Sequence, residues 1–168
     1  MLVEVTDNFL PDYQFKQIQN VMMGDYFPWF YNSYTCYPGD KNPMFTHTFF
    51  ALAPPWSGKK SSQFSLWEGC LQKLGCQKLF RIKSNLNVRT VFPRHSDYHI
   101  DYTNNPPIKT VIFYMNTCNG YTKFKKGGKV KSVANRLVIF DSNLEHAGVT
   151  CTDKESRVVV NFNYVPAL

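Results

Sequence analysis

The stretch KLFRIKSNLNVRTVF, residues 78–92, marks the point at which the pattern of the chain changes. From here on, short apolar segments alternate with turn-forming clusters such as TNNPP (103–107), which is the pattern of successive β-strands. The later strand-like segments are IKTVIFYMNT (108–117), GYTKF (120–124), GKVKSVA (128–134), NRLVIFD (135–141) and RVVVNFNYV (157–165). Such a run of about six to eight short strands predicts a β-sandwich or a jelly-roll barrel.

Two helices are predicted upstream of this run, and we expect them to pack outside the barrel. The first is LPDYQFKQIQNVMMG (10–24), in which Pro11 suits the first turn and Gly24 suits the end. The second is SSQFSLWEGCLQKLG (61–75), which has serine near its start and Gly75 as its stop.

Three further segments of the N-terminal half carry a structural signal. LVEVTDNF (2–9) and FTHTFFALA (45–53) are predicted to be strands. Residues 26–45 are rich in aromatic and turn-forming residues, which suits either a lid over a site or simple packing against the barrel.

The length of 168 residues predicts a single domain covering the whole chain, 1–168. Within it, residues 1–76 are expected to form a helical support and loop region, and residues 77–168 the strand-rich core. Hydrophobic residues make up 43% of the chain and aromatic residues 16%, which is typical of a globular protein.

Composition also narrows the class of protein. The five cysteines form no C-x-x-C pair, so a disulfide framework or zinc ribbon is not expected and a reducing cytoplasm fits best. No apolar run is long enough to span a membrane, and the N-terminus lacks the basic region of a secretory signal. The formal net charge of +7 weakly favours an anionic partner.

The segment HSDYHID (95–101) contains two of the four histidines of the chain. On a strand, residues 95, 97, 99 and 101 point to the same side, so His99 and Asp101 are able to hold one metal ion together. The only histidine downstream is His146, which is the candidate for a third ligand. Two imidazoles and one carboxylate form the facial triad of non-haem Fe(II) oxygenases, whose open positions accept a chelating co-substrate and dioxygen.

Two more residues extend this pattern. Arg157 opens the segment RVVVNFNYV, eleven residues after His146, and its guanidinium is suited to binding a carboxylate in bidentate geometry. Tyr114, in TVIFYMN, offers a hydroxyl donor. Taken singly, Arg157 is more often a surface salt-bridge residue and Tyr114 a core aromatic. The combination with the H-x-D pair and the distal histidine is far more specific than any one of them.

Four segments carry a resemblance to a known family: YHID (98–101), TVIFYMNTCNGYTKF (110–124), NRLVIFDSNLEHAG (135–148) and SRVVVNFNY (156–164). They resemble the 2-oxoglutarate- and Fe(II)-dependent dioxygenases, in particular the prolyl 4-hydroxylase-like subfamily and its small bacterial and viral members. The resemblance covers about half of the chain, residues 80–165. It implies a mainly β (α+β) fold, a double-stranded β-helix of jelly-roll or cupin-like type with the N-terminal helices packed outside. One departure is Asn119-Gly120, where many members carry Gly-Gly.

The resemblance also implies roles for individual residues. It implies His99, Asp101 and His146 as the iron ligands, Arg157 as the partner of the distal carboxylate of 2-oxoglutarate, and Tyr114 as a second contact to that carboxylate. The implied cofactors are Fe(II), 2-oxoglutarate and O2. The implied activity is hydroxylation of a substrate coupled to oxidative decarboxylation of 2-oxoglutarate to succinate and CO2.

The substrate is less well defined by the sequence. A peptidyl prolyl or other amino-acid side chain is expected from the subfamily, while a free amino acid or a nucleobase stays open. Two other functions are compatible with the sequence: a cupin-like metal enzyme that does not use 2-oxoglutarate, and a non-catalytic jelly-roll binding module. Arg157 discriminates between the first of these and an oxygenase.

Several other polar residues have two interpretations. Strand alternation predicts that Asn116 shares a face with Tyr114, and that Asn161 and Asn163 share a face with Arg157. Asn116 and Asn161 are therefore candidates for binding the co-substrate, or else they bond to each other or to water. The same alternatives apply to Lys83, Asn85 and Asn87.

The remaining polar segments are assigned more simply. His95 and Asp97 either support the metal site and substrate or are surface residues. The tract KFKKGGKVK (123–131) is expected to be a solvated hairpin tip, with contact to an anionic substrate or nucleic acid as the alternative. His47 is expected to be a structural histidine.

Overall fold

The last strand, β11 (Ser156–Pro166), separates the core of the protein from a cavity. Val158, Val160 and Phe162 point to one side, where they are buried in the main hydrophobic core. Arg157 and Asn161 alternate with them and point to the other side, into the cavity. One strand therefore carries core residues on one face and candidate functional residues on the other.

The computed structural model describes residues 3–40, 42–53, 58–103 and 107–167. The other elements are β1 (Glu4–Thr6), α1 (Asp12–Met22), β2 (Phe30–Asn32), β3 (Met44–Ala51), β4 (Lys59–Lys60), η1 (Phe64–Trp67), α2 (Glu68–Lys73), β5 (Cys76–Val88), β6 (Lys109–Tyr114), β7 (Tyr121–Phe124), β8 (Lys129–Lys131), β9 (Arg136–Asp141) and β10 (His146–Val149). The turn predicted at 103–107 includes residues 104–106, which lie outside the described residues.

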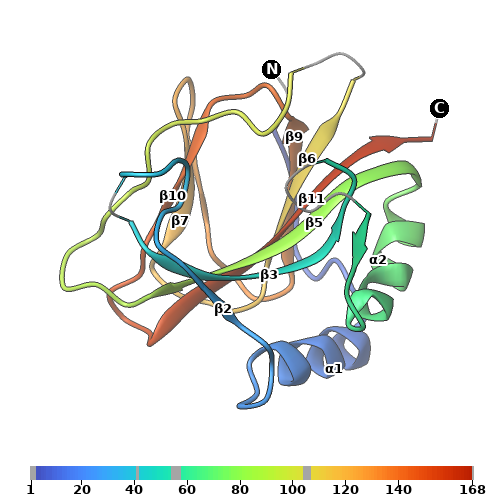
Figure 1. Cartoon of the computed structure of the whole chain (residues 1–168), viewed down its shortest axis with the longest axis horizontal. Coiled ribbons are helices and arrows are strands. Elements are labelled where there is room, and N and C mark those ends of the chain that lie inside the picture. The colour runs from blue at the N-terminus through green and yellow to red at the C-terminus, as the bar shows by residue number, and fades with distance from the viewer. Residues whose placement is uncertain (1–2, 41, 54–57, 104–106, 168) are drawn as a thin grey trace.

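Two antiparallel sheets form the β-structure (Figure 1). The large sheet has the strand order β1-β9-β6-β11-β5-β3-β2, with β4 paired to β3, and the small sheet has the order β10-β7-β8. Most neighbouring strands are distant in sequence, as in a jelly roll. The helices α1 and α2 cover one face of the large sheet, and the small sheet lies on its other side. The predicted double-stranded β-helix with helices outside is therefore confirmed.

The first part of the chain contributes to the sheet as well as to the helical layer. The predicted strands at 2–9 and 45–53 correspond to β1, which pairs with β9, and β3, which pairs with β5. The region 1–76 therefore completes the large sheet at both of its edges. Among the described residues, no helix is long and apolar enough to cross a membrane.

The second predicted helix is shorter than its sequence pattern suggests. Residues 64–67 form a 3₁₀ turn, and the α-helix proper is Glu68–Lys73. Ser61 does not cap this helix, because its hydroxyl is shared between Nε2 of His47 at 2.8 Å and the backbone N–H of Gln63 at 3.0 Å. Gly75 does end the helix as predicted, with a φ of 60° that favours glycine.

An aromatic cluster joins the helical layer to the large sheet. Trp67 is fully buried and makes edge-to-face contacts with Phe49, Phe113 and Phe162, with ring centroids 5.5, 6.2 and 5.2 Å away. These three phenylalanines come from β3, β6 and β11, so one side chain contacts three strands. Trp67 is therefore central to the attachment of the helices.

Trp67→Ala is expected to lower the free energy of unfolding by about 3–5 kcal/mol, because it leaves a large cavity in a closely packed core. Chemical denaturation followed by circular dichroism measures this. Trp67→Phe keeps a ring in place and also removes the buried indole N–H, which has no hydrogen-bond partner among the described residues. We expect Trp67→Phe to lower the free energy of unfolding by less than half as much as Trp67→Ala does. Equal losses in the two variants would contradict the packing role of Trp67.

Candidate active site

The segment 95–101 lies beside β10 without forming a regular strand. It is joined to β10 by two isolated bridges, His95 with Val149 and His99 with His146. The backbone N–H of each histidine in the second bridge donates to the carbonyl of the other, both at 3.0 Å. This segment therefore extends the small sheet irregularly, and the prediction of a continuous strand with four side chains on one face was wrong. Its two central ligand candidates nevertheless reach the same place.

His99, Asp101 and His146 form a compact group at this point. Each offers one ligand atom, and the three atoms all lie within 4.8 Å of one another. The rings of His99 and His146 have centroids 4.6 Å apart. His146 also packs edge-on against Phe140 of β9, at 4.8 Å between ring centroids, which holds it on the barrel wall. Two imidazoles and a carboxylate thus converge from two separate segments of the chain.

Among the described residues, His99 and His146 make hydrogen bonds only through Nδ1, so Nε2 of each ring is left for a metal. Nδ1 of His146 lies 2.9 Å from the carbonyl of Leu144, and Nδ1 of His99 lies 3.1 Å from the carbonyl of Asp97. A carbonyl can only accept, so we assign a proton to Nδ1 of each ring, and in the neutral form of each ring the lone pair is on Nε2. Burial lowers the pKa of His146, which favours the neutral imidazole that binds metals.

Asp101 is held in place by three polar side chains. Its Oδ1 lies 3.0 Å from Nη2 of Arg81, and its Oδ2 accepts hydrogen bonds from Thr110 Oγ1 at 2.9 Å and Asn163 Nδ2 at 3.0 Å. Burial alone raises the pKa of this carboxyl, but the charge of Arg81 and the hydrogen bond from Asn163 outweigh it and hold the pKa far below its usual range. Asp101 is therefore an oriented carboxylate.

A second polar cluster surrounds Arg157. Its Nη2 donates to Thr122 Oγ1 at 3.1 Å, and the hydroxyl of Tyr114 donates to the same oxygen at 2.8 Å. The guanidinium carbon lies 5.6 Å from the centre of the Tyr114 ring. Gly120 makes room for this side chain, because a Cβ at that position would lie only 2.6 Å from Arg157 Cδ.

Arg157 is buried without an acidic partner. Only 2% of its surface is exposed, and its Nε has no hydrogen-bond partner within the part of the chain that the structure describes. Each ion pair found there joins other residues: Arg81–Asp101, Lys109–Asp141, Lys125–Glu145 and Arg136–Asp7. A buried guanidinium without a counter-ion is costly, so this position is suited to a bound anion.

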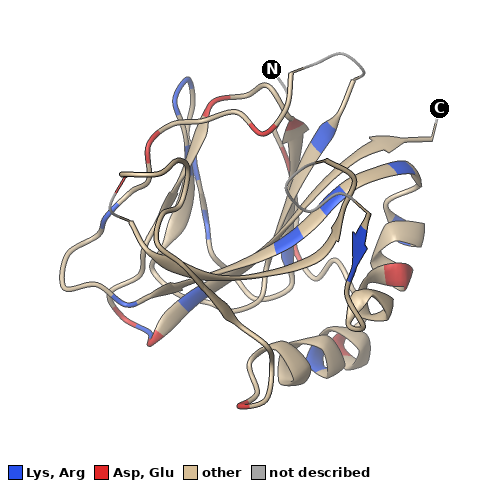
Figure 2. Cartoon of the chain, in the orientation of Figure 1, with Lys and Arg blue, Asp and Glu red and all other residues tan. Residues whose placement is uncertain are grey.

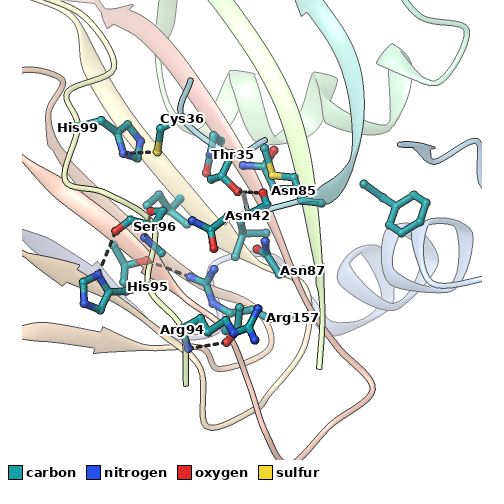
Figure 3. A pocket seen from close by; sticks show the side chains of 18 of the residues that line it. Thr35, Cys36, Asn42, Asn85, Asn87, Arg94, His95, Ser96, His99 and Arg157 are labelled. Carbon is teal, nitrogen blue, oxygen red and sulfur yellow. Dashed lines mark hydrogen bonds between the residues drawn. The ribbon is translucent and has the colours of Figure 1, made fainter. Parts of the chain in front are cut away.

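One cavity of about 420 Å³ connects the two clusters. His99, Asp101 and His146 line it together with Arg157 and Thr122, while Ile112 and Val159 supply apolar surface. Figure 3 shows His99 and Arg157 entering the same pocket. The cavity therefore offers a metal-binding group and an anion-binding group to a single ligand.

The two predicted amides lie in different surroundings. Asn161 lines the cavity, and its Oδ1 is buried without a partner among the described residues. Asn116 bonds instead to the backbone of β11, donating to the carbonyl of Ser156 at 2.7 Å and accepting from the N–H of Val158 at 2.9 Å. Both polar atoms of Asn116 are therefore engaged in holding the start of β11, and we do not include it in the proposed site.

His95 and Asp97 also lie in different surroundings. His95 lines the cavity, and its Nδ1 lies 3.1 Å from the carbonyl oxygen of Ser96. Asp97 instead accepts a hydrogen bond from the hydroxyl of Tyr37. Cys36, the neighbour of Tyr37, has its Sγ 3.4 Å from Nδ1 of His99. Asp97 therefore ties the loop that contains Tyr37 to the metal-binding segment.

Part of the segment 26–45 lines the site, but the prediction of a loop throughout was wrong, because Phe30–Asn32 form β2 and Met44 begins β3; residue 41 is not described. Thr35, Cys36 and Asn42 line the cavity. Asp40 stabilises the turn by accepting from the backbone N–H groups of Thr35 and Asn42, each at 3.0 Å. The loop has the position of a lid, and its movement stays a prediction.

Two other sequence assignments concern residues outside the cavity. His47 is a structural histidine as predicted, with Nδ1 2.9 Å from the carbonyl of Pro28 and Nε2 2.8 Å from Ser61 Oγ. The Lys-rich tract 123–131 forms the hairpin of β7 and β8, and none of its lysines lines the cavity.

The sequence patterns did not indicate a role for the supporting residues Arg81, Thr110 and Thr122. The sequence could have indicated Thr122, because the GYTKF segment is among those that resemble the family. Thr110 lies in the resembling segment 110–124 as well, whereas Arg81 carries no motif, and only the register of β5, β11 and β6 brings both residues to Asp101.

Comparisons with known proteins agree with this geometry at the level of the fold. No family model matches the sequence, and no curated protein matches it. Among solved structures, a prolyl-4-hydroxylase of Pseudomonas putida superposes with a TM-score of 0.61 at 12% identity, covering 98% of this chain and 92% of that one. A 2OG-Fe(II) oxygenase family protein of Burkholderia pseudomallei gives 0.67 at 10% identity, covering 96% and 84%.

A third structure is a prolyl hydroxylase of Trichoplax adhaerens in complex with a peptide fragment of the hypoxia inducible factor oxygen degradation domain. It gives a TM-score of 0.60 at 11% identity, covering 96% of this chain and 83% of that one. The chain therefore has the fold that these oxygenases share.

Proposed function

We propose that this chain, which has the fold of the 2OG-Fe(II) oxygenases, is itself an Fe(II)- and 2-oxoglutarate-dependent oxygenase. The observation that carries the proposal is the cavity that joins a His-Asp-His group to a buried arginine that has no acidic partner in the described part of the chain. A metal site alone suits many enzymes. A metal site that shares a cavity with an unpaired buried cation suits a ligand that chelates the metal and extends an anionic group away from it.

The residues fit Fe(II). The two free Nε2 atoms and the Asp101 carboxylate form a 2-His-1-carboxylate donor set, which occupies one face of a metal and leaves other positions open. Arg81, Thr110 and Asn163 orient the carboxylate. Such partners of a ligand typically change metal affinity or activity about 10–100-fold when they are lost.

The residues also fit 2-oxoglutarate. Arg157 presents a guanidinium fork to the far carboxylate, with the hydroxyl of Thr122 beside it in the cavity. Tyr114 is fully buried, donates its hydroxyl to Thr122 Oγ1 and is not among the residues that line the cavity, so its part is to hold Thr122. Ile112 and Val159 line the cavity as apolar wall. When bound, the metal and co-substrate supply dioxygen activation, in which 2-oxoglutarate is converted to succinate and CO2.

The reaction that we propose is hydroxylation of an amino-acid side chain, with a peptidyl prolyl residue as one candidate. The solved prolyl hydroxylases of the same fold support this choice by analogy only. In this account the contribution of the chain is to bind, orient and exclude water. The loop that carries Cys36 and Tyr37 covers the cavity beside His99 and serves the last of these tasks.

An anaerobic titration tests the proposal. Fe(II) is added to the metal-free protein and 2-oxoglutarate follows, while the visible spectrum is recorded. We expect a weak charge-transfer band that saturates with 2-oxoglutarate. Metal binding without the band favours a cupin-like enzyme that does not use 2-oxoglutarate, and absence of metal binding favours a non-catalytic binding module.

A further inference from the structure

The cavity keeps an excess of positive charge once the proposed metal and co-substrate are placed. Its basic lining residues are Arg81, Lys83, Arg89, Arg94 and Arg157, and Asp101 is the only acidic residue among the described residues that line it. The basic residues of β5 stand out in Figure 2. The charges of Fe(II) and doubly ionised 2-oxoglutarate cancel, so they leave this excess unchanged.

Most of this charge cannot be assigned to metal or co-substrate. Arg81 binds Asp101, and Arg157 is placed for the far carboxylate of 2-oxoglutarate. Arg89 and Arg94 are exposed at the mouth of the cavity. Lys83 remains inside, and it forms no ion pair or hydrogen bond with any residue that the structure describes. A partly buried cation in such a position is stabilised by an anionic partner from outside the chain.

The surroundings of Lys83 are those of an ammonium held away from water. It lies on the cavity side of β5, in register with Asn161 of β11 and Thr48 of β3. Burial and the neighbouring charge of Arg81 lower its pKa to about 8. The chain thus keeps a lysine whose ammonium is partly desolvated, and an anion beside it stabilises the charged form.

Amide groups surround the same space. Asn85 and Asn161 line the cavity, and the Oδ1 atom of each is buried without a partner in the described part of the chain. Figure 3 shows Asn42, Asn85 and Asn87 turned into the cavity that Arg157 enters. Their amides offer donors and acceptors to a ligand that the metal and co-substrate do not account for.

We propose that the substrate oxidised at this site carries an anionic group, a carboxylate or a phosphate, and that Lys83 binds it. The inference rests on the proposed function and adds the substrate class. The Nδ2 groups of Asn85 and Asn161 are donors that flank Lys83 and join it in binding the anion, whereas their buried Oδ1 atoms accept from a donor group of the same substrate. Arg89 and Arg94 attract the substrate to the mouth of the cavity. A peptide whose only feature is proline leaves Lys83 unpaired, whereas a carboxylate beside the oxidised carbon pairs it.

Inorganic phosphate is the probe for this site. The protein is loaded with Mn(II) in place of iron and with saturating 2-oxoglutarate, and the ³¹P linewidth of added phosphate is measured. Phosphate held by Lys83 lies close enough to the paramagnetic ion to be broadened in a saturable way. Lys83→Met is expected to weaken phosphate binding about tenfold or more, because it removes a charge-assisted hydrogen bond. Lys83→Arg keeps the charge and is expected to retain binding.

Lys78→Met is the matched control. Lys78 lies on the same strand, is exposed, and has its amino group 5.2 Å from the centre of the Phe80 ring. We expect this variant to bind phosphate like the parent. Free L-glutamate and a short acidic peptide are then added as competitors. The better competitor identifies whether the anionic group belongs to a small molecule or to a peptide.

Two results overturn the inference. Equal broadening in the parent and in Lys83→Met means that phosphate binds the metal or another surface. A loss of 2-oxoglutarate affinity in Lys83→Met, with phosphate binding unchanged, assigns Lys83 to the co-substrate instead. A parent protein that binds neither Mn(II) nor 2-oxoglutarate is a different failure, because it overturns the proposed function itself.

Discussion

His146→Ala is expected to lower the affinity for a divalent metal by more than about a hundredfold, because the loss of a ligand exceeds the 10–100-fold loss typical of its supporting partners. His146 is the buried member of the three-residue group, and its Nδ1 bond to Leu144 aims Nε2 in one direction. Neither His99 nor Asp101 is able to replace this donor, since each is held by its own partners. Isothermal titration with Mn(II) under nitrogen measures the change.

The charge-transfer band described above is expected to vanish in the same variant. His146→Gln is a useful companion because it keeps more of the side-chain volume against Phe140 and so separates metal loss from a packing defect. His95→Ala is the matched control for metal affinity, since His95 lines the same cavity without joining the group. Metal affinity of His146→Ala within about threefold of the parent would contradict the assignment.

Arg157→Met is expected to weaken 2-oxoglutarate binding by about a hundredfold or more while metal affinity stays unchanged. Hydrogen bonds to charged groups contribute about 1.5–3 kcal/mol each, and a guanidinium fork makes two of them with a carboxylate. Titration of the Mn(II)-loaded variant with 2-oxoglutarate gives the affinity. Arg136→Met is the control, because Arg136 pairs with Asp7 at the surface.

The stability of the same variant is equally informative. In the free protein Arg157 is buried without a counter-ion among the described residues. The variant Arg157→Met is therefore expected to have a free energy of unfolding about 1 kcal/mol or more above that of the parent. If Arg157 served only to stabilise the fold, its replacement by Met would lower the free energy of unfolding. Denaturation without and with 2-oxoglutarate decides between them, and a destabilised variant with normal 2-oxoglutarate affinity would refute the role proposed for Arg157.

The periodicity of the chain determined its strands and most of its chemistry. In RVVVNFNYV, alternation alone separates Val158, Val160 and Phe162, which enter the main core, from Arg157, Val159 and Asn161, which line the cavity. The types and spacing of His99, Asp101, His146 and Arg157 were enough to predict a metal and a carboxylate ligand. These inferences succeed because side-chain direction along a strand is a local property with a period of two.

Only the tertiary structure decided which side chains meet. Arg81, Thr110 and Asn163 surround Asp101 because β5, β11 and β6 are neighbours, although they are distant in sequence. Asn116 follows Tyr114 at the right interval but lies beyond the end of β6, where the backbone of β11 engages it. Sheet order, register and strand ends arise from non-local packing, which no local pattern encodes. The sequence therefore determined the reactive groups, and the fold decided that Lys83 stands inside the cavity without a partner among the described residues.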